Sequence, residues 1–252
     1  MGRKKLRKIW RKSGEKISDS RDGDQKICGE IWDFAGSEIW FENLVVGPQN
    51  ALAATIGQAV AAQPGELHNP FFVYGPVGLG KTHLLQAIGN EICKKFPEKV
   101  VLYLPCNKLI DEIITAIRNQ KLDALIRKFD DVDVLMIDDV QFLAKKETTQ
   151  DIFHNIFNDF HAKKKQVVFS SDRPPRELTN IAPRLQSRFG YGVIADIQPP
   201  DYEIRRAILQ TKLEARDARL SEEILDFVAS AVSESVRELE GALNSLLLQQ
   251  SL

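Results

Sequence analysis

Short apolar runs alternate with segments of helical periodicity through the middle of the chain. Five runs have the length and composition of buried strands, at residues 71–74, 100–104, 132–137, 166–169 and 193–197. Apolar residues spaced by three and four predict helices between them, after residue 82 and at about 109–118, 122–129 and 149–163. Strands that alternate with helices in this way predict an α/β fold, a parallel five-stranded sheet covered by helices on both faces.

The flanking segments have other patterns. A helix is predicted at about 50–62, and after Pro199-Pro200 the pattern changes to three helices, the last opened by an S-x-x-E capping box. Residues before about 38 lack sustained apolar periodicity. The predicted parts are a flexible arm (1–38), an α/β domain (39–199) and a small all-α domain (200–252).

The stretch FFVYGPVGLGKT, residues 71–82, leads from the first predicted strand into a helix. Gly75, four variable residues, Gly80, Lys81 and Thr82 spell G-x-x-x-x-G-K-[ST], the phosphate-binding loop. Glycines let successive backbone N–H groups converge on phosphates, and the positive end of the helix dipole adds to the attraction. Lys81 is expected to reach the β- and γ-phosphates and Thr82 to hold Mg²⁺. The chain is therefore predicted to bind a nucleoside triphosphate.

A second motif, VDVLMIDD at residues 132–139, ends an apolar strand in two carboxylates. Asp138 is expected to hold the metal and Asp139 to polarise the attacking water. The alternative is a solvated acidic turn, which the nearby phosphate loop makes the weaker interpretation.

The next strand ends in the polar sequence Ser170-Ser171-Asp172-Arg173. Because carboxyl ends of parallel strands meet the ligand, one of these side chains is expected to orient water near the γ-phosphate. Farther on, RLQSR places Arg184 and Arg188 four residues apart on a short helix. Either arginine is a candidate for insertion into a neighbouring subunit's site, and surface ion pairing is the alternative. These residue types alone do not decide between the two.

The net charge of −1 conceals a segregation of charge. Residues 1–16 carry eight basic side chains against one acid, a net +7, so the other 236 residues carry −8. Such an arm either attracts nucleic acid or anionic lipid, or is a disordered solubilising tail. The chain has no apolar stretch near the roughly 20 residues of a membrane span and no apolar signal-peptide core, so a soluble, cytoplasmic protein is expected.

Together these motifs resemble the AAA+ ATPase region of the bacterial replication initiator DnaA family. The matching text runs from about Phe41 to Leu247: FENLVVGPQN, NPFFVYGPVGLGKTHLLQAIGN, VDVLMIDDVQFLAKKE, SSDRPPREL, RLQSRFGYGVIADIQPPDYEIRRAIL and VRELEGALN. The resemblance implies an AAA+ P-loop NTPase fold with a helical lid. It also implies slow hydrolysis of ATP to ADP and phosphate, with ATP and Mg²⁺ as cofactors.

The resemblance further implies roles for individual residues. Lys81 and Thr82 correspond to contacts with ATP and Mg²⁺, Asp138 and Asp139 to the Walker B acids, and Asp172 to the sensor of the fourth core strand. The full set of implied nucleotide contacts is Gly75, Gly78, Gly80, Lys81, Thr82, His83, Arg184 and Arg237.

Three arginines acquire roles in the same way. Arg188 matches the arginine finger that reads a neighbour's ATP, and Arg184 matches the second arginine of that box. Arg237, in VRELEG on the last helix of the lid, matches the arginine that senses bound nucleotide; the alternative is a surface arginine on a capped helix.

The helices at 109–129 match an insertion that, in the family, gives ATP assemblies a helical pitch and lines a channel for single-stranded DNA. Ile114 and Lys146 match positions that contact the strand. Family members usually carry arginine just after K-E, where this chain has Thr148. Because a phosphate contact is lost, single-strand binding is expected to be weaker and less salt dependent.

Two further departures concern the ends of the chain. Nothing before Phe41 resembles the family's helicase-interacting N-terminal domain, and the sequence stops at Leu252, where a helix-turn-helix domain would begin. A fragment of an initiator and a short paralogue both remain open.

Three functional hypotheses follow. The first is an initiator-type ATPase whose ATP-dependent homo-oligomers, or assemblies with a full-length initiator, engage origin or single-stranded DNA. The second is a regulator or helicase-loader ATPase that acts through protein contacts, with a replicative helicase or its loader as partner. The third is a binding module whose ATP is structural.

Overall fold

The computed structural model describes residues 39–250. The predicted basic arm, 1–38, lies outside the described residues. Within the described part of the chain, no helix is long and apolar enough to cross a membrane.

The sheet has five parallel strands in the order β2-β3-β4-β1-β5. The strands are β1 (Phe71–Tyr74), β2 (Val101–Pro105), β3 (Val134–Asp138), β4 (Gln166–Ser171) and β5 (Val193–Asp196). The three central strands are almost wholly buried because helices cover both faces. The predicted fold class, a parallel five-stranded sheet covered by helices on both faces, is thereby confirmed.

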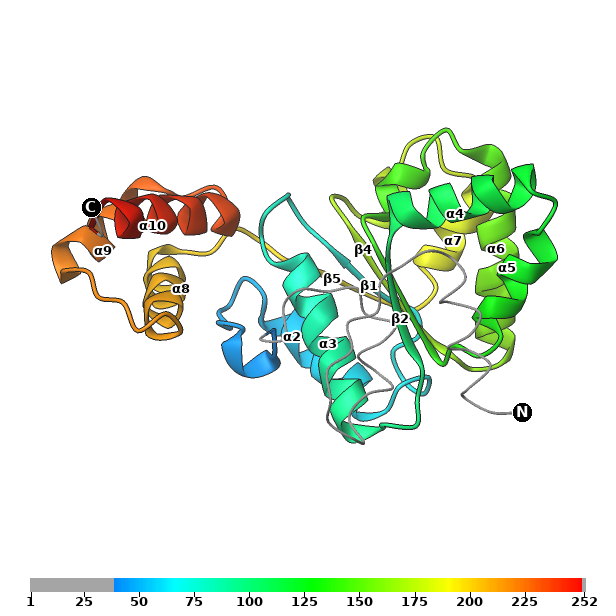
Figure 1. The fold of residues 1–252 in the computed structure, drawn as a ribbon, viewed down its shortest axis with the longest axis horizontal. Coiled ribbons are helices and arrows are strands. Elements are labelled where there is room, and N and C mark those ends of the chain that lie inside the picture. The colour runs from blue at the N-terminus through cyan, green and yellow to red at the C-terminus, as the bar shows by residue number, and fades with distance from the viewer. Residues whose placement is uncertain (1–38, 251–252) are drawn as a thin grey trace.

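Helices divide between the two faces (Figure 1). On one face lie α2 (Ala51–Ala62) and α3 (Lys81–Lys95), and on the other α4 (Cys106–Arg118), α5 (Leu122–Phe129), α6 (Glu147–Ala162) and α7 (Pro183–Phe189). Strand side chains alternate between these two cores: Tyr103 and Met136 face α3, whereas Leu102 and Ile137 face the α4–α7 side.

The last three helices form a separate small core of their own. They are α8 (Tyr202–Glu214), α9 (Glu222–Ala231) and α10 (Val236–Gln250), set apart from the sheet in Figure 1. Side chains cap two of them: Asp201 accepts the Ile204 N–H at 2.9 Å, and the Ser235 hydroxyl accepts the Glu238 N–H at 3.2 Å. We call α8–α10 the lid.

Three short 3-10 helices, η1 (Phe41–Asn43), η2 (Val140–Leu143) and η3 (Pro175–Glu177), complete the order of elements. The main differences from the predicted bounds lie at helix starts. Helix α4 begins at Cys106, directly after the last residue of β2, and α6 begins at Glu147, two residues before the expected start.

Candidate nucleotide-binding site

The phosphate-loop sequence connects β1 to α3 at the carboxyl end of the sheet. Gly75 and Gly78 both have positive φ, 153° and 83°. A Cβ at Gly75 would lie 2.2 Å from the Ile197 carbonyl oxygen, and one at Gly78 would lie 2.5 Å from the Ser235 hydroxyl of the lid. Only glycine allows both the turn and these close approaches.

Lys81 is the first residue of α3 and is 6% exposed. Its Nζ donates to the carbonyl oxygens of Gly75 at 2.6 Å and Pro76 at 2.8 Å. Burial lowers the pKa of Lys81, and the nearby acids Asp139, Asp138 and Asp172 oppose that shift. The Lys81 ammonium group therefore donates to loop carbonyl oxygens. When a nucleotide binds, its anionic phosphates would replace those oxygens as acceptors.

Asp138, the last residue of β3, is 5% exposed and accepts hydrogen bonds from three hydroxyl groups. Its Oδ2 accepts from Thr82 Oγ1 at 2.7 Å and from Tyr103 Oη at 2.5 Å, and its Oδ1 accepts from Ser170 Oγ. Burial and the adjacent carboxylate of Asp138 raise the pKa of Tyr103, so the phenol stays a donor. Tyr103 belongs to none of the sequence motifs, so no role was predicted for it.

Asp139 adopts a left-handed backbone, with φ 61° and ψ 52°. Its N–H donates to Ser170 Oγ at 2.8 Å, and its Oδ1 accepts from Gln141 Nε2 at 3.0 Å. Non-glycine residues in this region are strained and are held there by their surroundings, often at functional sites. In this conformation the Asp139 carboxylate meets the Gln141 amide.

Gln141 also reaches the fourth strand, because its Oε1 accepts the Asp172 N–H at 3.4 Å. The Asp172 carboxylate is held by Arg173, whose Nε and Nη2 donate to its two oxygens at 2.9 and 2.7 Å. These hydrogen bonds lower the pKa of Asp172. One amide thus links the two acids expected to act on water.

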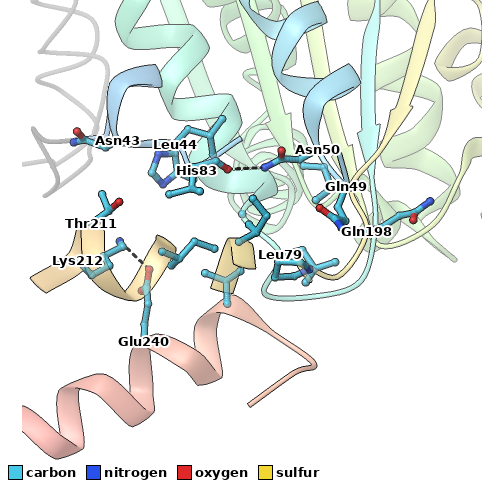
Figure 2. A pocket seen from close by; sticks show the side chains of 17 residues that line it. Asn43, Leu44, Gln49, Asn50, Leu79, His83, Gln198, Thr211, Lys212 and Glu240 are labelled. Atoms are coloured by element: carbon cyan, nitrogen blue, oxygen red, sulfur yellow. Dashed lines mark hydrogen bonds and ion pairs between the residues drawn. The ribbon is translucent and has the colours of Figure 1, made fainter. Parts of the chain in front are cut away.

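A pocket lies beside the loop, between residues 43–50, the start of α3 and the lid (Figure 2). His83 lines it, with Nε2 3.4 Å from the Trp40 carbonyl oxygen, and burial lowers the pKa of His83. From the lid, Lys212 and Glu240 form an ion pair at 2.8 Å. The other lining residues are Asn43, Leu44, Val45, Gln49, Asn50, Leu79, Gly80, Ile197, Gln198, Pro200, Ile204, Ile208, Thr211 and Val236.

Of the residues that line this pocket, only Gly80 and His83 were predicted as nucleotide contacts from the sequence. Its walls come from segments far apart in the chain, and only FENLVVGPQN, quoted for the family resemblance, gave a signal for the segment at 43–50.

Of the three predicted arginines, the structure brings one to the loop. Arg237 N donates to the Gly78 carbonyl oxygen at 3.3 Å, and its charge acts on Lys81. Arg184 and Arg188 lie on α7, whose core residues pack on the opposite face of the sheet from α3. The Arg184 guanidinium pairs with Asp151 on α6, and Arg188 is partly exposed nearby.

The two residues predicted to contact DNA lie on the α4–α7 side. Ile114 is half-buried on α4, packed against the core, and Lys146 is exposed just before α6. Helix α4 packs on η2, which precedes Lys146.

The donor set at Asp138 suits Mg²⁺. Mg²⁺ prefers oxygen ligands and is usually held by one or two carboxylates together with substrate phosphates and water. Asp138 and the Thr82 hydroxyl supply such oxygens beside the loop. No group of three or more His, Cys, Asp or Glu side chains that could hold a metal occurs among residues 39–250.

Comparison with known proteins gives consistent matches. A model described as the bacterial DnaA ATPase domain matches residues 36–196. The chromosomal replication initiator protein DnaA of Thermodesulfovibrio yellowstonii is 48% identical over 212 residues, 84% of this chain and 48% of that protein. The chain spans about half the length of the curated relatives it matches.

Solved structures agree with this result. Domain III of DnaA from Thermotoga maritima matches with a TM-score of 0.83 at 42% identity, covering 85% of this chain and 90% of that one. A replication initiator DnaA bound to AMPPCP and single-stranded DNA matches with a TM-score of 0.79 at 36% identity, covering 86% and 66%. A DnaC helicase loader, 16% identical with a TM-score of 0.56 over 63% of this chain and 96% of that one, shares the fold alone.

Proposed function

Because this chain belongs to the bacterial DnaA ATPase domain family, we propose that it binds ATP with Mg²⁺, hydrolyses it slowly and assembles in the ATP state on origin or single-stranded DNA. The observation that carries the proposal is the hydrogen bond from Thr82 Oγ1 to Asp138 Oδ2, 2.7 Å long, close to the ammonium group of Lys81. The regulator or loader alternative is not favoured, since relatives of high identity are initiators and the loader likeness concerns the fold.

Each residue of the site has a part in the proposed reaction. The loop N–H groups and Lys81 bind the β- and γ-phosphates, replacing the Lys81 contacts with Gly75 and Pro76. Thr82 and Asp138 would hold Mg²⁺, and the ion would neutralise charge on these phosphates. Asp139, oriented by Gln141, takes a proton from the attacking water, and Asp172 helps to orient that water.

The pocket between residues 43–50 and the lid is proposed to hold the base and ribose, with His83 on its wall. Arg237 is proposed to sense the phosphates from the lid, because its backbone already contacts Gly78. Residues 200–252 then act as a lid whose position reports whether nucleotide is bound.

Assembly is proposed to depend on Arg188. The support is that α7, which carries Arg188, packs on the face of the sheet opposite α3, and that Arg188 is partly exposed there. A nucleotide that contacts two subunits stabilises their association by the free energy of those contacts. The partner is a second copy of this chain or a full-length initiator, with Arg184 steadying α7 through Asp151.

DNA binding is proposed for the α4–α7 side, through Ile114 and Lys146. The support is the 36% identical relative whose structure is described with AMPPCP and single-stranded DNA. The arginine usual in the family is replaced here by Thr148, so we expect lower affinity and a shallower salt dependence than for an arginine-bearing relative.

The test is anisotropy of a labelled single-stranded oligonucleotide at fixed salt, with a non-hydrolysable ATP analogue or ADP. The full chain is compared with a chain lacking residues 1–16, which separates binding by the body from attraction by the arm. We expect the shortened chain to bind with the ATP analogue and not with ADP, and Arg188→Ala to abolish that binding. Binding that is absent, or resides wholly in the arm whatever the nucleotide, would overturn the proposal.

A further inference from the structure

Three neighbouring strands bring polar side chains to the same point on the α3 face. Tyr103 on β2 stands opposite Met136 on β3, and Met136 stands opposite Val168 on β4. Because strand side chains alternate, Asp138 and Ser170, each two residues farther along, lie on the same face as Tyr103. The carboxyl end of β3 therefore has a hydroxyl group on each side.

Tyr103 is paired with Met136, two residues before Asp138, so its side chain must extend along the strand to reach the Asp138 carboxylate. Two residues of a strand cover about 6.6 Å, close to the reach of a tyrosine side chain. The Tyr103 hydroxyl meets Asp138 Oδ2 at 2.5 Å, and the side chain is 5% exposed. A shorter side chain at this position would leave that oxygen without this donor.

The three donors to Asp138 differ in what they can do when nucleotide binds. Thr82 belongs to the phosphate loop, and its hydroxyl is the one expected to turn to Mg²⁺. Tyr103 and Ser170 belong to strands of the sheet, so their hydroxyl groups stay beside Asp138 when the loop binds nucleotide. Asp138 Oδ2 accepts from two hydroxyl groups, those of Thr82 and Tyr103. When the Thr82 hydroxyl turns to Mg²⁺, the Tyr103 hydroxyl still donates to this oxygen.

We propose that Tyr103 is a positioning residue for the metal site: its hydroxyl fixes the Asp138 carboxylate so that Mg²⁺ and nucleotide bind together. The inference rests on the proposed function, because it assumes that Asp138 holds the Mg²⁺ of bound ATP. Hydrogen-bond partners of metal-binding carboxylates commonly matter 10- to 100-fold in metal affinity.

The experiment uses the full chain and ATP carrying a fluorescent label on its ribose. Affinity for the labelled ATP is measured in EDTA and across a titration of Mg²⁺, for the wild type and Tyr103→Phe, which removes one oxygen and keeps the ring. We expect the Mg²⁺ concentration at half-saturation to rise about 10- to 100-fold in Tyr103→Phe, with affinity in EDTA unchanged.

The matched control is Tyr202→Phe in the lid. Tyr202 makes the same kind of bond, its hydroxyl donating to Asp226 Oδ1 at 2.8 Å. This variant is expected to keep the Mg²⁺ dependence of the wild type. Ser170→Ala removes the donor to Oδ1 and is expected to raise the Mg²⁺ requirement as well, which preserves a test if Tyr103→Phe does not fold.

The outcomes separate two kinds of failure. A wild type that binds no labelled ATP would overturn the proposed function itself. The role of Tyr103 alone would be overturned if the wild type binds labelled ATP in a Mg²⁺-dependent way and the folded variants keep the same Mg²⁺ requirement. It would also be overturned if the variants lose affinity to the same extent in EDTA as in Mg²⁺.

Discussion

The contact between the phosphate loop and the lid at Gly78 gives a prediction whose size follows from the structure. In Gly78→Ala, the new Cβ would lie 2.5 Å from the Ser235 hydroxyl oxygen and 3.3 Å from the Arg237 Cβ, so Ser235 must move. Moving it breaks the cap on the Glu238 N–H, at a cost of about 1 kcal/mol. The backbone at φ 83° adds about 1–2 kcal/mol for any residue with a Cβ.

Gly80→Ala is the matched control. Its φ of 92° carries the same backbone cost, but a Cβ there would meet nothing within 4 Å. In urea unfolding of the full chain without nucleotide, followed by helical circular dichroism, we expect Gly78→Ala to be less stable than Gly80→Ala by about 1 kcal/mol.

A double variant tests the cause of that difference. Ser235→Ala removes the clashing oxygen and the cap together, so adding Gly78→Ala to it should cost only the backbone part, about as much as Gly80→Ala. Equal destabilisation by Gly78→Ala and Gly80→Ala, or strict additivity of Gly78→Ala with Ser235→Ala, would show that the loop and lid are not coupled at this contact.

Two further predictions concern Gln141 and His83. Gln141→Ala removes the amide that holds Asp139, so we expect the steady-state ATPase rate to fall about tenfold while ATP affinity is kept. The control is Asn244→Ala, which removes an exposed amide that bonds Arg216 outside the site and should leave the rate unchanged. A normal rate in Gln141→Ala would contradict the role of Gln141. Burial lowers the pKa of His83 in the folded chain below the ordinary value of 6.5. The unfolded chain therefore binds a proton at His83 more readily than the folded chain does. The free energy of unfolding is expected to decrease as the pH falls below 6.5. His83→Gln should show a smaller loss between pH 7 and 5 in urea unfolding, whereas an identical loss would mean that His83 contributes nothing to it.

Local patterns predicted those parts of the fold that depend on local order. The five strands are continuous apolar runs, and the phosphate loop and paired acids have fixed spacing in the chain, so periodicity and motif were enough to place Lys81, Thr82 and Asp138.

Features that depend on register or on distant segments were missed. Tyr103 looks like one more apolar strand residue, and only the pairing of β2 with β3 shows that its hydroxyl meets Asp138. Gln141 acts from a 3-10 turn that has no periodicity. The pocket walls from 43–50 and from the lid come together only in the folded chain. The early starts of α4 and α6 reflect helix ends, where apolar spacing carries little information.

The left-handed backbone of Asp139 sets a limit on how this domain can be improved. Glycine adopts that conformation at no steric cost, so a search that selects for thermal resistance alone would tend to replace the aspartate by glycine. Glycine lacks the carboxylate that we propose accepts a proton from water. Selection for robustness and selection for turnover therefore pull in opposite directions at this position, and a library that varies it must be screened for both.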